Sequence, residues 1–188
     1  MRAFALALLL ASCAADTVPE GSGVFVGTLD GGRIFAASVW QPDRVLIYTC
    51  GVDETLPEST AWLIGNTASG TVEATDGPFS VVATREGERV QGSFVGMDGP
   101  QDLQLEEIAA GEDAGFFALI DGECRTALIA FEEAGALRFQ GAHFCGALGP
   151  FFQVTPVLPP EVLGDDLRVR FDDGTGEQEL ILPRLTGI

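Results

Sequence analysis

The chain has 188 residues, of which 46% are apolar and 20% charged, and this balance is too hydrophobic for an intrinsically disordered protein. Its 28 acidic residues outnumber 10 arginines and give a net charge of −18, so its surface should repel phosphate backbones and anionic headgroups. We therefore expect a folded chain of ordinary domain size that binds no nucleic acid and does not adhere to a membrane through charge.

An apolar run from Ala3 to Ala11 opens the chain, behind one cation at Arg2. A bilayer-spanning helix needs about twenty apolar residues, so the run is too short to span, but it has the length of a signal-peptide core. Leu10-Ala11-Ser12-Cys13 then resembles a bacterial lipobox, in which the leader is cut before a cysteine that receives lipid. The alternatives are an ordinary secretory leader cut near Ala14 or Ala15, and a buried first strand.

The lipobox resemblance implies an address in the cell envelope. Residues 1–12 would be a lipoprotein signal peptide, Cys13 the site of lipid attachment and residues 13–22 a small, polar tether. Ala14 in place of aspartate after the lipidated cysteine implies export to the outer membrane of a Gram-negative cell, facing the periplasm. The implied partners are the membrane, through the lipid anchor, and a protein of the envelope.

From residue 23 onward, short β-rich runs alternate with turns that contain glycine. Asp-Gly begins at Asp30, Asp76, Asp98, Asp121 and Asp173, and these are hairpin turns by default because glycine takes positive φ freely. The predicted strands are Val24 to Leu29, Arg33 to Trp40, Arg44 to Cys50, Ala61 to Gly65, Thr71 to Thr75, Phe79 to Thr84, Arg89 to Val95, Asp102 to Ile108, Gly115 to Ile120, Cys124 to Phe131, Ala136 to Phe144, Leu167 to Phe171 and Glu179 to Leu182. We predict an all-β fold, an antiparallel meander that closes into a barrel or barrel-like sandwich, in one domain over residues 23–188.

An ordered set of short motifs resembles a small β module found in exported bacterial proteins. The motifs are Phe25-Val26-Gly27, Phe35-Ala36-Ala37, Asp43 to Cys50, Glu88 to Gly92 with Asp98-Gly99, and Ala114 to Phe117. The resemblance covers residues 23 to 140. It implies export and one continuous β fold, and it carries no implied activity.

Candidate catalytic residues are few, so we expect no enzyme and no cofactor. His143 is the only histidine of the chain, and a lone histidine on a strand is more often structural than a general base. The acid pairs Glu106-Glu107 and Glu132-Glu133 could in principle serve a glycosidase. As strand neighbours, however, the two members of each pair should point to opposite faces.

Metal ligation is not expected either. Cys50, Cys124, Cys145 and His143 are the whole stock of soft ligands after the leader, and thiols pair with each other in an oxidising compartment. Asp172 to Glu177 is acidic enough to suggest a calcium site, but it lacks the alternating acids of an EF-hand loop. A hairpin turn is therefore the better interpretation.

Residues 146–164 form a Pro-rich strap with large apolar side chains and neither helical nor strand periodicity. Proline excludes the segment from central positions of a sheet. One interpretation is that its apolar side chains cover an open end or edge of the sheet. The other is a lid over a ligand cavity, or an exposed patch that docks a partner.

The three cysteines after Cys13 allow one internal disulfide. If Ala134-Gly135 is the two-residue loop of a hairpin, Cys124 faces Cys145 at a non-hydrogen-bonded position, where Cα atoms approach to about 4.5 Å, within disulfide range. We therefore predict the Cys124–Cys145 bridge and a buried, unpaired Cys50. The alternatives are that Cys50 takes one partner, or that a longer loop shifts the register.

Two functions remain from the sequence. The first is a non-enzymatic envelope lipoprotein that acts as an interaction or structural module at a membrane surface. The alternative is a carrier of a small apolar ligand in a barrel cavity lined by Trp40, Trp62, Phe94 and Phe117. A continuous internal cavity would favour the carrier, and a solid core would favour the interaction module.

Overall fold

The computed structural model describes residues 21–109, 112–146, 152–154, 156 and 159–188. The predicted signal peptide, Cys13 and nearly all of the tether lie outside these residues, as does much of the Pro-rich strap. None of the helices in the described ranges has the length and apolar character needed to cross a bilayer.

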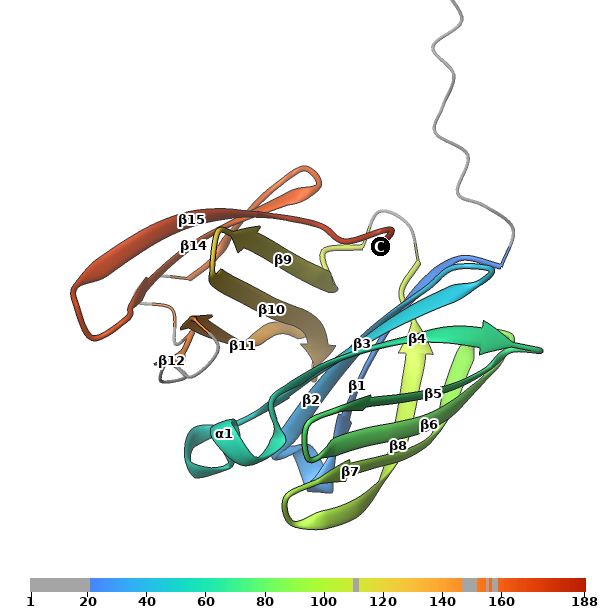
Figure 1. The fold of residues 1–188 in the computed structure, drawn as a ribbon. Coiled ribbons are helices and arrows are strands. Elements are labelled where there is room, and N and C mark those ends of the chain that lie inside the picture. Colours follow the sequence, from blue (N-terminus) through green and yellow to red (C-terminus); the bar gives the residue numbers. More distant parts are fainter. Residues whose placement is uncertain (1–20, 110–111, 147–151, 155, 157–158) are drawn as a thin grey trace, which may run out of the picture.

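The regular secondary structure of the described residues is almost all β-strand, which confirms the predicted all-β fold (Figure 1). The elements are β1 (Gly23–Leu29), η1 (Asp30–Gly32), β2 (Ile34–Trp40), β3 (Arg44–Gly51), η2 (Asp53–Thr55), α1 (Leu56–Ser59), β4 (Ala61–Ala68), β5 (Thr71–Asp76), β6 (Phe79–Glu86), β7 (Arg89–Gly96), β8 (Gly99–Glu107), β9 (Gly115–Asp121), β10 (Cys124–Glu133), β11 (Ala136–Cys145), β12 (Phe152–Gln153), β13 (Glu161–Leu163), β14 (Asp166–Asp172) and β15 (Glu177–Pro183). Strands β1 to β8 form a closed antiparallel barrel in chain order. A four-stranded sheet, β12-β11-β10-β9, and a three-stranded sheet, β13-β14-β15, follow.

The Asp-Gly turns connect paired strands, as predicted. Asp98 lies in the two-residue loop between Gly96 and Gly99, and Asp76 pairs with Phe79 at the end of the β5–β6 hairpin. Gly77 in the β5–β6 loop and Gly99 at the start of β8 both adopt positive φ, a conformation that glycine takes freely. The turn residues therefore determine that consecutive strands pair with each other along most of the chain.

Side chains fill the interior of the barrel. Every strand of the barrel contributes alternate residues to one buried cluster, as expected for eight strands, whose interior is just wide enough for side chains. The cluster contains Phe25, Leu29, Ile34, Ala36, Trp40, Val45, Ile47, Ala61, Leu63, Val72, Ala74, Val81, Ala83, Val90, Phe94, Leu103 and Leu105. Inside the barrel, the indole of Trp40 donates a hydrogen bond to the hydroxyl of Ser38 at 3.1 Å.

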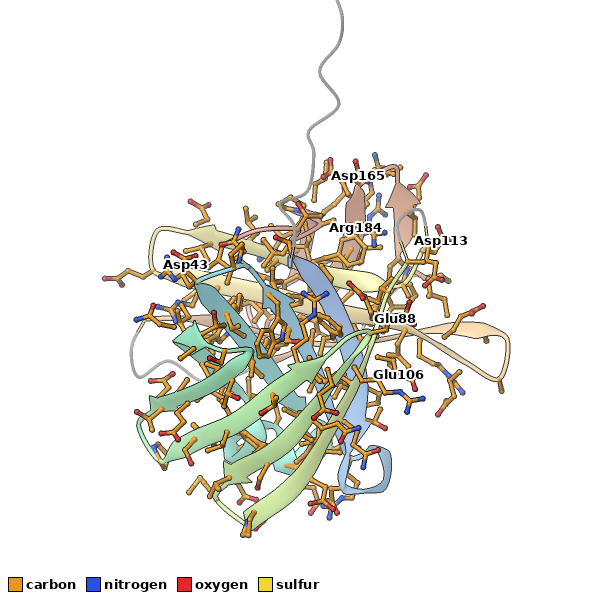
Figure 2. The ribbon with its side chains drawn as sticks, turned by 90° about the vertical axis from the view of Figure 1, so that its right-hand side faces the viewer. Asp43, Glu88, Glu106, Asp113, Asp165 and Arg184 are labelled. Atoms are coloured by element: carbon orange, nitrogen blue, oxygen red, sulfur yellow. A yellow bond between two sulfur atoms is a disulfide. The ribbon has the colours of Figure 1, made fainter. Side chains whose placement is uncertain are left out.

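The wall of the barrel differs from one side to the other. Strands β5 to β8 alternate buried and more exposed residues, because their outer face meets solvent. Glu88, in the turn between β6 and β7, is one of the exposed charged side chains of this side of the barrel (Figure 2). Strands β2 and β3 are buried nearly throughout, because their outer face is also covered by protein.

The four-stranded sheet covers that outer face. Ala37, Val39, Leu46 and Tyr48 of the barrel wall pack in one cluster with Phe116, Ala118, Ala127, Ile129 and Ala142 of β9 to β11. The opposite face of the same sheet packs on β14 and β15 through Phe117, Leu128, Ala130, Leu167, Val169, Phe171 and Leu182. The molecule is therefore layered as barrel wall, middle sheet and outer sheet (Figure 1). Being covered on both faces, β10 is fully buried from Thr126 to Ala130.

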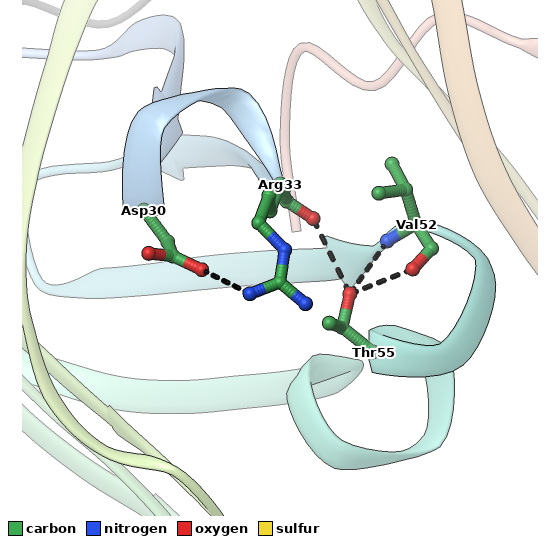
Figure 3. Close-up of polar contacts among 4 residues, drawn as sticks. All are labelled: Asp30, Arg33, Val52 and Thr55. Atoms are coloured by element: carbon green, nitrogen blue, oxygen red, sulfur yellow. Dashed lines mark hydrogen bonds and ion pairs between the residues drawn. The ribbon is translucent and has the colours of Figure 1, made fainter.

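At one end of the barrel, the β3–β4 connection forms hydrogen bonds with the turns that join other strands. The Thr55 hydroxyl oxygen accepts a hydrogen bond from the Val52 N–H at 2.9 Å and lies 2.8 Å from the Val52 carbonyl and 3.4 Å from the Arg33 carbonyl (Figure 3). Next to it, Arg33 and Asp30 form an exposed ion pair at 3.3 Å. The Met97 N–H then bonds to the Glu58 carbonyl at 3.1 Å, which joins this connection to the β7–β8 turn.

The sequence missed the shortest elements, which are η1, η2, α1, β12 and β13. Each has two to four residues, too few to show a period of 2 or 3.6. Two of them fall in the Pro-rich strap: β12 pairs with β11, and β13 pairs with β14. Val154 is buried in the cluster between the middle and outer sheets, and its N–H bonds to the Gly141 carbonyl, so residues 152–154 lie along the edge of β11 while β13 extends the outer sheet.

Candidate functional site

A groove of about 860 Å³ runs between the barrel and the tip of the β10–β11 hairpin. Its walls come from β1, β8, the segment before β9, and the hairpin. It is lined by Val26, Gly27, Thr28, Gln104, Glu106, Glu107, Ile108, Glu112, Asp113, Ala114, Phe131, Glu132, Glu133 and Leu137. Figure 2 shows Glu106 and Asp113 on this side of the molecule. We call this the acidic groove because carboxylates are its commonest lining group.

Within the part of the chain that the structure describes, three of the six carboxylates of the acidic groove form an ion pair. Arg89 lies 3.6 Å from Glu106, Arg85 lies 3.3 Å from Glu107, and Arg138 lies 3.3 Å from Glu133. Two of these pairs are well exposed, so each contributes little to stability.

The other three carboxylates, Glu112, Asp113 and Glu132, are exposed and form no ion pair within the described residues. Their negative charge is therefore available to a ligand.

Arg184, which follows β15, holds the segment that carries two of these acids. Its guanidinium donates hydrogen bonds to the carbonyl of Ala114 and, at 2.9 Å, to that of Glu112, and it lies 4.8 Å from the ring centre of Phe117. These bonds go to backbone oxygens, so they position Glu112 and Asp113 without neutralising either carboxylate directly. Arg184 also borders a smaller pocket of about 340 Å³ that shares Glu112 and Asp113 with the acidic groove.

Both acid pairs that the sequence raised as glycosidase candidates border the groove. Glu106 and Glu107 nevertheless meet different arginines, Arg89 and Arg85, in keeping with the expectation that strand neighbours diverge. Glu107 is partly buried and Glu106 is exposed. The sequence did not single out Glu112 and Asp113, because two more acids in a chain with 28 form no distinctive pattern.

The four aromatic residues proposed to line a ligand cavity are divided among three clusters. Trp40 and Phe94 lie in the filled barrel interior. Trp62 points outward from β4 toward the middle sheet, where it packs near Tyr48 and Phe116. Phe117 lies on the far face of that sheet. The structure therefore does not bring these four side chains together around one space.

The Cys124–Cys145 disulfide is confirmed. Glu133 pairs with Ala136 at the tip of the hairpin, so the register places Cys124 opposite Cys145, with a Cα–Cα distance of 3.9 Å. Cys124 is partly buried and Cys145 is exposed. The next pair on the same face is Thr126 with His143.

His143 is held between the middle and outer sheets. Its Nδ1 lies 2.8 Å from the Thr126 hydroxyl oxygen, its Nε2 lies 3.4 Å from the sulfur of Cys145, and its ring centre lies 5.3 Å from that of Phe171. Burial lowers the pKa of His143, and the negative charge of Asp173 offsets part of that effect. Among the described residues, the sulfurs of Cys124 and Cys145 and a ring nitrogen of His143 lie within 4.8 Å of one another, which is close enough for all three to contact one metal ion.

The Asp172 to Glu177 segment is a hairpin turn, as predicted. Asp173 accepts hydrogen bonds from the N–H and the hydroxyl of Thr175 at 2.8 and 2.6 Å, and these bonds lower the pKa of its carboxyl. Asp172 accepts from the Gly174 N–H at 2.8 Å. Both acids thus use a side-chain oxygen to stabilise the turn.

Cys50 is free and fully buried between the barrel and the middle sheet, as predicted. The side-chain amide of Gln140 donates a hydrogen bond to its sulfur at 3.6 Å and to the Gly51 carbonyl at 2.9 Å. Burial raises the pKa of the Cys50 thiol and that of the neighbouring Tyr48 hydroxyl. Both groups are therefore neutral at physiological pH and help to join two layers of the fold.

Comparison with known proteins does not extend this description: no protein-family model matches the chain, and no curated protein matches it at a significant level.

Proposed function

We propose that this protein is a non-enzymatic lipoprotein of the cell envelope, anchored through Cys13, whose acidic groove binds a basic segment of a partner protein at the membrane surface. The observation that carries the proposal is the groove itself, with about 860 Å³ of space and three carboxylates that lack a paired cation among the described residues. Its size is within the range of specific binding sites.

The chemistry of the groove favours arginine and lysine side chains as ligands. Exposed carboxylates accept charge-assisted hydrogen bonds from guanidinium and ammonium groups, and arginine can engage one carboxylate through two bonds. The apolar lining residues Val26, Ile108 and Phe131 can pack against the aliphatic stems of such side chains. The overall charge of −18 would also speed the approach of a basic partner.

The place where the described chain begins supports action near a membrane. Ser22 and Gly23, at the start of the described chain, border the smaller pocket beside the acidic groove. A ten-residue tether from Cys13 spans at most about 35 Å when extended. An anchor at Cys13 would therefore keep the groove within reach of basic segments that lie close to the same membrane.

The carrier hypothesis receives less support from the fold. Large side chains fill the barrel interior, and the proposed aromatic lining residues lie in three separate clusters. A continuous internal cavity would have favoured the carrier, and a solid core favours the interaction module. We therefore retain the interaction module as the proposed function.

Neutralising the unpaired acids of the groove should weaken binding of a short arginine-glycine peptide. We expect the triple variant Glu112→Gln, Asp113→Asn, Glu132→Gln to bind such a peptide about tenfold more weakly than the parent chain, because three exposed charge pairs are lost. Isothermal titration calorimetry at an ionic strength of about 0.15 M, where the Debye length is about 8 Å, measures the difference.

A control triple variant removes the same charge elsewhere. Asp43→Asn, Glu54→Gln and Asp98→Asn change exposed acids that do not line the acidic groove. This variant should bind the peptide within about twofold of the parent chain, because distant exposed charges are largely screened. Equal losses in the two variants would show that the peptide senses only net charge and would overturn the groove as a binding site.

The anchor has a separate test. Cys13→Ser should abolish incorporation of a tagged fatty acid in growing bacteria and release the protein from the membrane fraction, because the acylated sulfur is gone. Fluorescence of the tag on a gel reports the labelling. A Cys50→Ser chain, which removes a buried thiol, should label as the parent does. Undiminished labelling of the Cys13→Ser chain would show that Cys13 is not the acylated residue.

A further inference from the structure

Three soft ligand groups converge at the open end of the β10–β11 hairpin. The sulfurs of Cys124 and Cys145 and a ring nitrogen of His143 all lie within 4.8 Å of one another. The Nε2 atom of His143 is 3.4 Å from the Cys145 sulfur. The acidic groove lies at the other end of the hairpin, so this corner is separate from the proposed binding site.

The strand register explains why the three groups share one face. Cys145 and His143 are two residues apart on β11, and side chains two apart on a strand point the same way. Cys124 is directly opposite Cys145 on β10, and opposed residues also share a face. The backbone ladder therefore holds the three side chains together whether or not the sulfurs are bonded to each other.

We propose that reduction of the Cys124–Cys145 disulfide converts this corner into a binding site for one thiophilic divalent ion of the Zn²⁺ class, held by both cysteine sulfurs and His143 Nε2. A dithiol supplies two electrons and two protons: the S–S bond breaks, two cysteine thiols form, and the dithiol becomes its own disulfide. The metal ion then replaces the two thiol protons, which pass to water. The oxidised protein binds no metal here, because its sulfurs are bonded to each other.

The spacing fits tetrahedral coordination. With metal–sulfur bonds of about 2.3 Å and metal–nitrogen bonds of about 2.0 Å, a sulfur and a nitrogen ligand lie about 3.5 Å apart and two sulfurs about 3.8 Å apart. The His143 nitrogen and the Cys145 sulfur are already at 3.4 Å. After reduction, the two sulfurs reach the second spacing by rotation about their side-chain bonds, without movement of the strands.

Thr126 fixes the imidazole in the orientation that a ligand needs. Its buried hydroxyl lies 2.8 Å from His143 Nδ1, and Phe171 packs against the ring. When Nδ1 carries the proton and donates it to this hydroxyl, Nε2 directs its lone pair toward the sulfurs. A hydrogen bond from the second ring nitrogen is the usual support of a metal-binding histidine.

The surroundings leave a route to the site and one free coordination position. Cys145 is exposed, so an ion and a reductant can approach from solvent. The negative charge of Asp173, which acts on His143, also favours a cation at this corner. Three protein ligands leave the fourth tetrahedral position to water or to a group from outside, as in zinc sites with an open position.

Cobalt binding to the full chain carrying Cys13→Ser tests the proposal, because Co²⁺ can substitute for Zn²⁺ and reports thiolate coordination by absorption. The protein is reduced with a dithiol, separated from it by gel filtration under argon and titrated with Co²⁺. We expect one ion per chain with thiolate-to-metal absorption, its displacement by Zn²⁺, and no such absorption from the oxidised protein.

Three variants in the same background assign the ligands. His143→Gln should weaken Co²⁺ binding by at least about tenfold, and Thr126→Val by about tenfold, since loss of a supporting hydrogen bond costs metal sites 10- to 100-fold in affinity. Cys50→Ser should bind as the parent does, because that thiol is buried in another layer.

Circular dichroism of each oxidised variant, before reduction, verifies its fold. The proposal is overturned by a reduced parent chain that binds no Co²⁺, by His143→Gln binding as tightly as the parent, or by Cys50→Ser abolishing the absorption. It is also overturned if the reduced chain unfolds and does not regain its native spectrum when Zn²⁺ is added. None of these outcomes depends on the acidic groove or on the lipid anchor.

Discussion

Replacing Phe116 with alanine should lower the free energy of unfolding by about 3–5 kcal/mol, the cost of removing a buried phenylalanine side chain from a packed core. Phe116 lies on β9 with none of its surface exposed and belongs to the cluster that joins the barrel to the middle sheet. Its ring centre is 5.3 Å from that of Tyr48 and 6.0 Å from that of Trp62. The substitution would leave a cavity between the barrel and the middle sheet. The backbone hydrogen bonds within each sheet hold its strands in place, so the two layers cannot move together to fill the cavity. Urea unfolding followed by tryptophan fluorescence gives the difference.

A control on the same strand separates the loss of this buried contact from any general effect of truncating a side chain on β9. Ile120 is 63% exposed, and Ile120→Ala should change the free energy of unfolding by less than about 0.5 kcal/mol. If Phe116→Ala lost less than about 1 kcal/mol, the layered packing between barrel and middle sheet would be contradicted.

The hairpins were predictable because their loops are short and their chemistry is local. Once Ala134-Gly135 was assigned as a two-residue loop, the period of two along each strand fixed the opposition of Cys124 and Cys145. No partner from elsewhere in the chain was needed to derive this pair. The meander of the barrel follows in the same way from its Asp-Gly and Glu-Gly turns.

The layering was not predicted, although the sequence carries a signal for it. Strands β2 and β3 read as continuous apolar runs and not as an alternation, which is typical of strands buried on both faces. These apolar runs do not show which part of the chain covers the outer face of β2 and β3. In the structure it is the middle sheet, whose β10 strand shows the same uninterrupted burial from Ala127 to Ala130.

The grouping of the aromatic residues could not be derived, because it depends on a register across a long connection. Trp40 pairs with Val45, and Trp62 pairs with Tyr48. Val45 and Tyr48 are an odd number of residues apart on β3, so the two tryptophans must face opposite sides of the barrel wall. The β3–β4 connection, with η2 and α1, has no two-residue turn from which the second pairing could be read.

The acidic groove is a product of tertiary structure. Its carboxylates come from β8, from the segment before β9 and from β10, and only folding brings them together. Because acids are spread along the whole chain, their spacing in the sequence does not distinguish these from solvated surface acids. Arg184, 72 residues after Glu112 in the chain, holds Glu112 and Asp113 at the groove through its bonds to the backbone carbonyls of Glu112 and Ala114.

Removing the disulfide should lower the free energy of unfolding by about 3 kcal/mol. The two cysteines are 21 residues apart in the sequence, and closing a loop of that size reduces the entropy of the unfolded chain by an amount worth about 3 kcal/mol. The double variant Cys124→Ala, Cys145→Ala tests this in urea unfolding of the Cys13→Ser chain. It should still fold, because the long ladder between β10 and β11 and the packing of both faces of β10 remain.

A dithiol provides the matched control for this prediction. It should bring the stability of the parent chain close to that of the double variant, and it should leave the double variant unchanged, since the one remaining thiol, Cys50, is buried and unpaired. A double variant as stable as the oxidised parent would show that the bridge adds nothing to the hairpin. The test also bears on the metal site: a loss of about 3 kcal/mol leaves a protein of ordinary stability, about 5–15 kcal/mol, folded after reduction. Only a reduced chain that stays folded can present two thiols and His143 on one face before the metal ion arrives.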